Sequence, residues 1–295
     1  MTEMTISEAK RIEREFYRKP KPTEDEIFLY TEAMDYIIQT TKEPQAMMAL
    51  GGYYYDERQF ELALKYYEMA AEYKFNSAYE CLGYIWYYGR TGTRDYEKAF
   101  KYFSLAREGG NVVAAYKLAD MYKNGYYVEK NYEKYCEIIE ELYPVVNNAS
   151  NLGEPLPEIF TRLAKIRSEQ GRINEAIQLY YRAKDFLAQR ISYNAFFGSL
   201  NIMMWLEDDL YKLTDFDPEN FDFYDLYHLA KAPVKVRFYF EDEEQIWEVV
   251  EEDGELVIRF NDKWFRTGED FFAKACIGNN PLTHIYDALY DFEVI

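Results

Sequence analysis

The chain has little of what catalytic and metal sites are usually built from. Of its 295 residues only two are histidines, His228 and His284, and only three are cysteines, Cys81, Cys136 and Cys276. These residues form no CxxC, no HExxH and no other spacing suited to a metal ion, and the sequence has no GxSxG, Walker or GxGxxG motif. We therefore expect no metal, no cofactor and no enzymatic activity. An enzyme with an unrecognised site is kept as a third alternative.

Long apolar runs are also missing. The charged start MTEMTISEAKRIEREF contains no apolar segment of the kind found in signal peptides. The most apolar stretch, Asn194 to Leu206, is shorter than the roughly 20 residues needed to cross a bilayer. The odd number of scattered cysteines argues against a disulfide framework and for a reducing compartment. Together these features predict a cytoplasmic protein with no membrane partner.

Basic charge is scarce in one part of the chain. The formal net charge is −19. Residues 207–295 contain 23 Asp and Glu against 8 Lys and Arg, whereas the other 206 residues contain 30 Asp and Glu against 26 Lys and Arg. Nucleic-acid phosphates and anionic membranes both need a basic face, so neither is expected as a partner. The change in charge also predicts a boundary near residue 207.

A repeated pattern is present between residues 50 and 183. Its first half is a Leu, a small residue and, three positions later, an aromatic; its second half is Ala, a large apolar residue and a small one. Apolar spacing within each half predicts two amphipathic helices per copy. The first halves are Leu50-Gly51-(x2)-Tyr54, Leu82-Gly83-(x2)-Trp86, Leu118-Ala119-(x2)-Tyr122 and the degenerate Leu163-Ala164-(x2)-Arg167; the second halves are Ala63/Tyr67/Ala70, Ala99/Phe103/Ala106, Tyr135/Ile139/Leu142 and Ala176/Tyr180/Ala183.

These residues resemble the tetratricopeptide repeat. Two copies carry four extra loop residues, in "YYGRTGTRDYEKAFKYFSLAREGG" and "YKNGYYVEKNYEKYCEII", and look like the Sel-one-like subclass of that family. The resemblance covers about residues 44 to 190. It implies an α-α superhelical solenoid of stacked helical hairpins and a protein-interaction scaffold, which binds a protein or peptide on its concave surface.

The rest of the chain predicts three further parts. Residues 1–43 read as a capping hairpin with helices at Ser7–Phe16 and Glu24–Thr41, the second capped by Thr23. Repeats are assigned to 44–213, including a buried helix near Ser192–Leu213, and an acidic linker to 214–233.

Residues 234–295 predict a small antiparallel α+β module. Strands are expected at Val234–Phe240, Ile246–Glu251 and Leu256–Asn261, with a tight hairpin at "EEDG" and an edge strand at Trp264-Phe265. Helices are expected at Thr267–Cys276 and Pro281–Leu289. A helical continuation is the weaker alternative.

The resemblance also implies a docking surface. Such repeats line the concave surface with first-helix residues two and five positions from the Leu. An aromatic strip of Tyr55, Tyr84, Tyr87 and Tyr116 suits an extended or helical peptide, unless the N-terminal helices or the C-terminal module cover it. The residues carried over for partner binding are Met48, Tyr55, Glu80, Tyr84, Tyr87, Tyr116, Asp120 and Lys123.

A second function of a different class follows from the acidic C-terminal region. The sequence predicts one acidic turn at Glu241, Asp242, Glu243 and Glu244 and another at Glu251, Glu252 and Asp253. If the flanking strands form one meander, these clusters lie at opposite ends of a shared strand. The excess of 23 Asp and Glu over 8 Lys and Arg in residues 207–295 suggests an acidic inhibitor or immunity-type protein that neutralises a basic partner. The plainer explanation is charge that only keeps the protein soluble.

Overall fold

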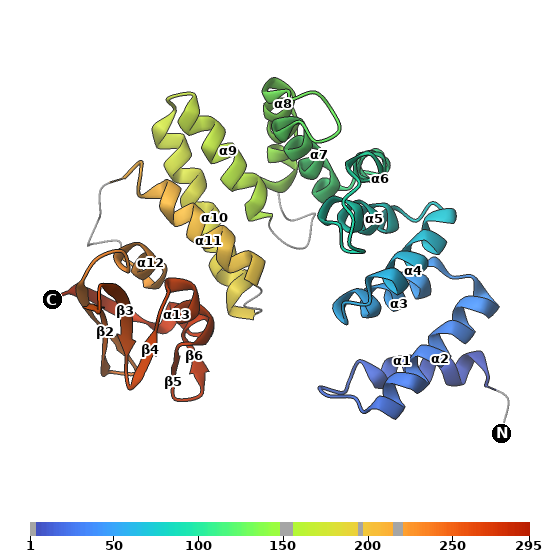
Figure 1. Cartoon of the computed structure of the whole chain (residues 1–295), viewed down its shortest axis with the longest axis horizontal. Coiled ribbons are helices and arrows are strands. Elements are labelled where there is room, and N and C mark those ends of the chain that lie inside the picture. The colour runs from blue at the N-terminus through green and yellow to red at the C-terminus, as the bar shows by residue number, and fades with distance from the viewer. Residues whose placement is uncertain (1–3, 148–155, 194–196, 215–220) are drawn as a thin grey trace. The chain divides into compact units, whose positions relative to one another are not determined.

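The computed structural model describes residues 4–147, 156–193, 197–214 and 221–295 (Figure 1). The chain forms two compact units, Met1–Ile138 and Ile139–Ile295, whose boundary falls inside one helix. The first unit contains α1 (Ile6–Phe16), α2 (Glu24–Thr41), α3 (Pro44–Asp56), α4 (Phe60–Glu72), α5 (Asn76–Tyr88), α6 (Tyr96–Glu108), α7 (Val112–Asn124) and the start of α8 (Tyr132–Asn147).

The second unit begins with helices and ends in a sheet. Its helices are α9 (Pro157–Glu169), α10 (Ile173–Tyr193), α11 (Phe197–Leu210), α12 (Leu226–Leu229) and α13 (Gly268–Lys274), with 3-10 turns η3 (Phe223–Asp225), η4 (Leu282–His284) and η5 (Tyr286–Ala288). Its strands are β1 (Val234–Phe240), β2 (Glu243–Glu252), β3 (Glu255–Phe260), β4 (Lys263–Phe265), β5 (Cys276–Ile277), β6 (Asn280–Pro281) and β7 (Tyr290–Val294). The prediction of stacked helical hairpins followed by a small α+β module is confirmed.

The two N-terminal helices expected at Ser7–Phe16 and Glu24–Thr41 are present as α1, which begins one residue earlier, and α2. The hydroxyl of Thr23 accepts a hydrogen bond from the backbone N–H of Glu26 at 3.3 Å, and the Glu26 carboxylate accepts one from Thr23 N–H at 2.8 Å. This reciprocal pair satisfies two of the N–H groups that a helix start leaves unpaired, so α2 begins where the prolines end.

The repeat register is also confirmed. The residues of the first three copies that should be most buried are at most 3% exposed: Leu50, Leu82, Leu118, Ala63 and Ala99. In the first two copies the residue beside the Leu must be small because the second helix packs directly against it. A Cβ built on Gly83 would stand 2.4 Å from the ring of Phe103 in α6, and one built on Gly51 would stand 2.7 Å from the ring of Tyr67 in α4. Only glycine lets the two helices of these hairpins approach so closely.

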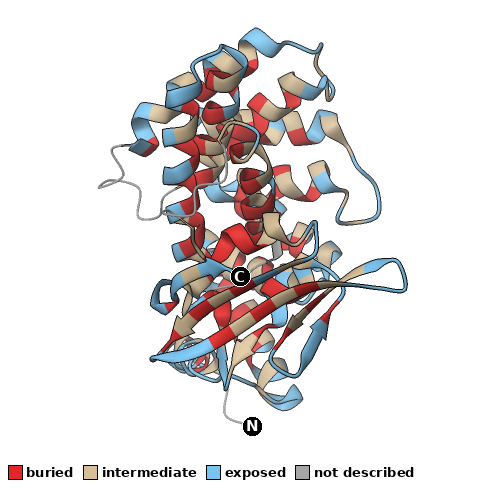
Figure 2. Cartoon of the chain, turned by 90° about the vertical axis from the view of Figure 1, so that its left-hand side faces the viewer, coloured by how far each residue is buried: buried red, intermediate tan, exposed pale blue. Residues whose placement is uncertain are grey.

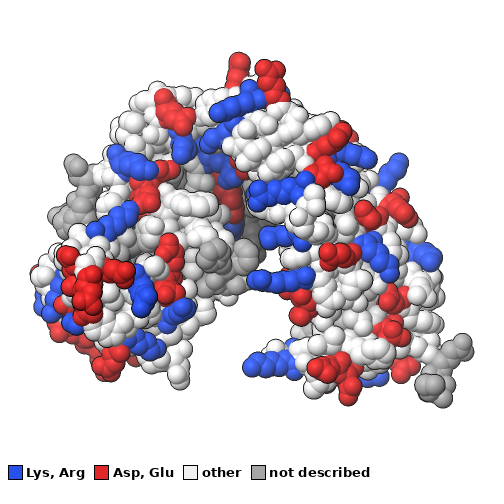
Figure 3. Space-filling model, in the orientation of Figure 1, with Lys and Arg blue, Asp and Glu red and all other residues white. Residues whose placement is uncertain are grey.

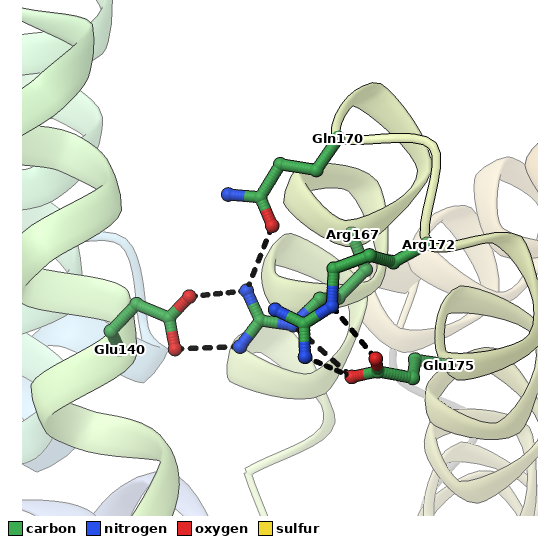
Figure 4. A network of polar contacts seen from close by, with 5 residues as sticks. All are labelled: Glu140, Arg167, Gln170, Arg172 and Glu175. Carbon is green, nitrogen blue, oxygen red and sulfur yellow. Dashed lines mark hydrogen bonds and ion pairs between the residues drawn. The ribbon is translucent and has the colours of Figure 1, made fainter.

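The fourth hairpin, α9 with α10, replaces the expected aromatic by Arg167. This side chain is 8% exposed, and its guanidinium forms a two-pronged contact with Glu140 of α8, in which Nη2 donates to Oε2 at 2.7 Å (Figure 4). Arg167 Nε also lies 3.6 Å from Glu175 of α10. The degenerate motif therefore marks a position where an ion pair holds α8 to α9 in place of ring packing.

The C-terminal module is a five-stranded antiparallel sheet in the order β4-β3-β2-β1-β7. Buried and half-buried residues alternate along its strands, as Figure 2 shows, so one face is covered and the other is open to solvent. Phe271 of α13 packs against Trp247 and Phe260 on the covered face. The predicted strands and the edge strand β4 are confirmed. The helix expected at Thr267–Cys276 is the shorter α13, which Thr267 caps, and Cys276 belongs to β5.

Three details of the sequence prediction were wrong. The helix expected at Pro281–Leu289 is two 3-10 turns, and the chain continues as β7, which pairs with β1. Strand β2 is 10 residues long, so that four of the acidic residues expected in turns belong to its ends. The expected Ser192–Leu213 helix begins only at α11, because α10 continues to Tyr193.

The predicted acidic linker is partly a folded contact. We call Lys184, Glu207, Asp222 and Asp225 the Lys184 cluster. The Lys184 ammonium of α10 lies 2.9 Å from Glu207 of α11, 2.9 Å from Asp222 and 3.1 Å from Asp225, and Tyr211 donates to Asp225 at 3.1 Å. One ammonium therefore joins three carboxylates and fixes η3 against α10 and α11. Residues 215–220 of the same segment lie outside the described residues.

Candidate interaction face

The first helices α3, α5 and α7 of successive repeats carry tyrosines that form one connected surface. We call Tyr55, Tyr84, Tyr87, Tyr88, Tyr116, Arg90 and Lys117 the tyrosine face. Figure 3 shows that Lys and Arg side chains gather along one side of the unit that contains these helices. The surface is built from contacts between neighbouring repeats.

Lys117 of α7 lies at the centre of the tyrosine face. Its side chain is buried at 8% exposure, and its ammonium donates a hydrogen bond to the Tyr88 hydroxyl at 2.9 Å. The ammonium also lies 5.3 to 5.7 Å from the ring centres of Tyr84, Tyr87 and Tyr116. Rings at this distance stabilise a cation through their negative faces. Lys117 forms no ion pair with any carboxylate of the described residues.

Arg90 extends the tyrosine face to α3. It follows Gly89, whose φ of 64° ends α5 in the left-handed region. Backbone bonds from Arg90 N to Ile85 O at 3.0 Å and from Asp95 N to Trp86 O at 3.1 Å hold the loop. Arg90 Nε then donates to the Tyr55 hydroxyl at 3.1 Å, and its guanidinium lies 5.1 Å from the Tyr88 ring centre.

The next loop repeats this arrangement with a different side chain. Tyr126 follows Gly125 as Arg90 follows Gly89, and its ring lies 6.0 Å from that of Tyr87. In the first two repeats, the tyrosine five positions after the Leu, Tyr55 or Tyr87, is therefore contacted by the loop of the following repeat. The four extra residues of these loops provide the reach.

The structure brings three of the predicted strip residues together. The hydroxyls of Tyr84 and Tyr116 are 3.4 Å apart, and the ring centre of Tyr87 lies 5.7 Å from the Lys117 ammonium. Tyr55 joins them through Arg90. Tyr84, Tyr87 and Tyr55 are half-buried, but Tyr116 is 5% exposed. Tyr116 was expected in this strip as a contact for the partner, but it is buried, with its hydroxyl beside that of Tyr84 in the preceding repeat.

The other predicted binding residues lie at the edges of the tyrosine face or in the core. Met48 packs into the apolar clusters on both sides of α3. Glu80 accepts a hydrogen bond from the Asn111 side chain at 2.6 Å, and the Lys123 ammonium lies 4.8 Å from the Tyr135 ring centre. Asp120 lies near the Tyr87 hydroxyl, where its charge helps to raise the pKa of that group.

Burial sets the protonation of the tyrosine face. Burial raises the pKa of Tyr84 and Tyr87 well above the ordinary phenol value, and the neighbouring hydroxyl of Tyr116 and carboxylate of Asp120 add to the effect. Burial also raises the pKa of Glu80. The phenols therefore keep their protons at neutral pH and can act as hydrogen-bond donors.

The repeat pattern in the sequence does not point to Tyr88, Arg90 or Lys117. Lys117 directly precedes the buried Leu118, a position for which the repeat pattern gives no role. Arg90 lies in a loop that was read only as a connection. A possible signal was the excess of bases over acids between residues 90 and 123, seven against four.

The acidic residues predicted as a second site are all exposed. Glu241 and Asp242 form the β1–β2 turn, Glu243 and Glu244 begin β2, and the other three end β2 or lie in the next turn. Figure 3 shows acidic side chains crowded over this module. Two of these carboxylates already have partners within the module. Asp242 accepts a hydrogen bond from the Tyr290 hydroxyl at 2.8 Å, and Glu252 forms an ion pair with Arg259 at 3.2 Å.

Metal-binding groups and membrane-spanning helices are both missing from the part of the chain that the structure describes. Within those residues no group of three or more His, Cys, Asp or Glu side chains could hold a metal ion. The same residues include no helix with the length and apolar character that crossing a bilayer requires. The Lys184 cluster is closed to substrates at Glu207, which is fully buried.

The comparisons with known proteins agree with this architecture. The family model described as the Sel1 repeat matches residues 44–72, 78–111 and 112–134. It does not extend to α9 and α10, although Leu163, Ala164 and Ala176 are buried there as in the other hairpins. No curated protein matches the chain in sequence.

Two solved structures resemble the chain. The crystal structure of a Sel1 repeat protein from Oxalobacter formigenes has a TM-score of 0.50 and 18% identity, and the match covers 73% of this chain and 80% of that one. The structure of c5321, a protective antigen of uropathogenic Escherichia coli with an SLR fold, has a TM-score of 0.33 and 17% identity, over 70% and 56% of the chains. The first supports the fold. The chain therefore carries Sel1 repeats over residues 44–134.

Proposed function

We propose that this protein is a non-enzymatic interaction scaffold that binds a protein or peptide on the tyrosine face. The observation that carries the proposal is the continuity of this surface over three repeats, from Tyr55 of α3 to Lys117 of α7. Sel1 repeats are in general protein-interaction scaffolds.

The composition of the tyrosine face suits a docking site. Tyrosine and arginine are enriched among the residues that carry most of the binding energy in protein interfaces, since each combines a large contact area with directed hydrogen bonds. Tyr88 is 38% exposed and Arg90 is exposed, so both are open to a partner. The half-buried tyrosines around them supply a rigid floor, which lowers the entropy cost of binding.

A comparative capture experiment tests this proposal. The full chain is used as bait in an extract of its source cells, alongside a Tyr88→Ala variant and a matched Tyr73→Ala control. Tyr73 is 50% exposed at the end of α4, in the same unit but outside the tyrosine face. We expect a partner that the parent and the control retain and that Tyr88→Ala binds at least about tenfold more weakly. A partner retained equally by all three would contradict the proposal.

A second candidate is the inhibitor function of the acidic C-terminal region. It is supported by the exposure of all seven acidic residues and by their position at the two ends of β2. A strand of ten residues spans roughly 30 Å, well beyond the screening distance of about 8 Å at physiological salt. A basic partner would have to contact both ends to use the whole charge. The same capture experiment at low and high salt separates the candidates, because only this one requires a basic partner and strong salt dependence.

A further inference from the structure

The exposed end of the tyrosine face has hydrogen-bond donors without acceptors. Lys117 donates to the Tyr88 oxygen, so the Tyr88 O–H has its own hydrogen available to another acceptor. Arg90 likewise donates through Nε to the Tyr55 oxygen, which leaves the Tyr55 O–H available. The two terminal nitrogens of the Arg90 guanidinium have no hydrogen-bond partner among the residues that the structure describes.

Two cationic side chains flank the Tyr88 ring at this end. The Arg90 guanidinium and the Lys117 ammonium lie 5.1 Å and 5.4 Å from the centre of the same Tyr88 ring. Neither forms an ion pair with a carboxylate of the described residues, although the chain as a whole has a formal charge of −19. Lys117 is also buried, and Asp120 near the Tyr87 hydroxyl forms no direct ion pair with it. A buried cation that lacks a direct ion pair is costly unless other groups stabilise it. An incoming anion would therefore gain more here than at an ordinary surface lysine.

We propose that Arg90, Tyr88 and Tyr55, with Lys117 behind them, accept a carboxylate of an Asp or Glu side chain in the bound partner. A carboxylate offers only acceptors and matches the planar fork of a guanidinium. The Tyr88 O–H, polarised by Lys117, donates to the same group. This inference rests on the proposed function of the tyrosine face and names the chemistry of its partner.

A single carboxylate fits the charges better than a polyanion. The chain as a whole has a formal charge of −19, which disfavours binding of a long phosphate chain, whereas one carboxylate on a peptide is recognised at short range. The donors are also few and confined to one end of an otherwise aromatic surface. The partner segment is therefore one in which an acidic residue lies beside apolar or aromatic ones.

Selection from a random twelve-residue peptide library displayed on phage, with the full chain as target, tests this inference. We expect enriched clones to share an Asp or Glu next to apolar residues. Their synthetic peptides should bind Arg90→Gln and Tyr88→Phe about ten- to a hundredfold more weakly, as loss of a hydrogen bond to a charged group requires. Arg94→Gln, which removes the same charge from the same loop, should bind like the parent. Circular dichroism shows whether each variant is folded.

The outcomes separate this inference from the function on which it rests. Clones that Tyr88→Ala no longer binds but that lack an acidic residue would overturn the carboxylate site and leave the docking face in place. Clones that are indifferent to Tyr88→Ala, or an absence of enriched clones, would overturn both. A labelled single-stranded oligonucleotide that binds the parent and not Arg90→Gln would also overturn the inference, in favour of a phosphate ligand.

Discussion

Replacing Glu207 with Gln should remove a pH dependence from the stability of the second unit. Glu207 is fully buried in the Lys184 cluster. Burial raises the pKa of its carboxyl to about 8, although Lys184 opposes the effect. Burial alone would lower the pKa of Lys184, but the three carboxylates together raise it, so this lysine stays charged throughout the range considered. The proton on Glu207 leaves the cluster closer to electrical neutrality.

The sign of the effect follows from the difference in the pKa of the Glu207 carboxyl between the folded and the unfolded chain. The unfolded carboxyl has a pKa of 4.5 and the folded one about 8, so the folded chain holds an extra proton between these values. The free energy of unfolding therefore decreases as pH rises from 4.5 to 8, and the loss is complete above pH 8. The difference corresponds to about 2 to 5 kcal/mol, the upper figure applying if Glu207 titrates alone.

Urea unfolding followed by tryptophan fluorescence measures this effect. Trp205, Trp247 and Trp264 lie in the second unit, so its unfolding dominates the signal. We expect Glu207→Gln to match the parent at pH 5 and to be more stable by a few kcal/mol at pH 9. The control is Glu251→Gln, an exposed residue with the same change in charge. If Glu207→Gln keeps the pH slope of the parent, the carboxyl titrates normally and the reasoning is wrong.

Three further changes test other parts of the structure. Gly83→Ala should destabilise the first unit by about 1 to 3 kcal/mol, seen as a lower thermal midpoint, because the new Cβ would stand 2.4 Å from the Phe103 ring; a higher midpoint would mean that the ring moves freely. Glu140→Gln should cost roughly 1 to 2 kcal/mol in urea unfolding, since it breaks the two-pronged contact with the buried Arg167; an unchanged midpoint would show that Glu175 suffices. Replacing the acidic residues Glu241–Glu244 with Gln should leave the melting temperature unchanged or slightly higher, and should slow association with a basic partner only if the inhibitor function is real.

Local patterns in the sequence were sufficient for the helical repeats. A Leu with a small neighbour, repeated with helical spacing, can be buried only if a second helix packs closely against it. The contact of Gly83 with Phe103 is that packing. The Thr23 cap and the strands of the C-terminal sheet followed in the same way, because caps, turns and alternating burial depend on neighbours in the chain.

The misassigned elements depend on contacts between distant residues. Residues 281–289 have apolar residues at helical spacing, but they form the 3-10 turns η4 and η5, and the chain then continues into β7, which pairs with β1. The Lys184 cluster joins positions 184, 207, 222 and 225, and nothing near Asp222 in the sequence indicates a lysine 38 residues earlier. The sequence showed that the segment around Asp222 is acidic, but not that Asp225 is buried against Lys184.

Some features of the tyrosine face likewise follow from the sequence, and others depend on contacts between distant residues. The sequence alone determined that Tyr84 and Tyr87 lie on the same face of α5, because helical geometry fixes the direction of each side chain from its distance to Leu82. Only the tertiary structure decided that Arg90 reaches back to Tyr55, that Tyr116 is covered and that Lys117 is buried among tyrosine rings. Those features depend on how far one repeat is displaced from the next, and that displacement is set by the packing of whole side chains rather than by the spacing of residues within one helix.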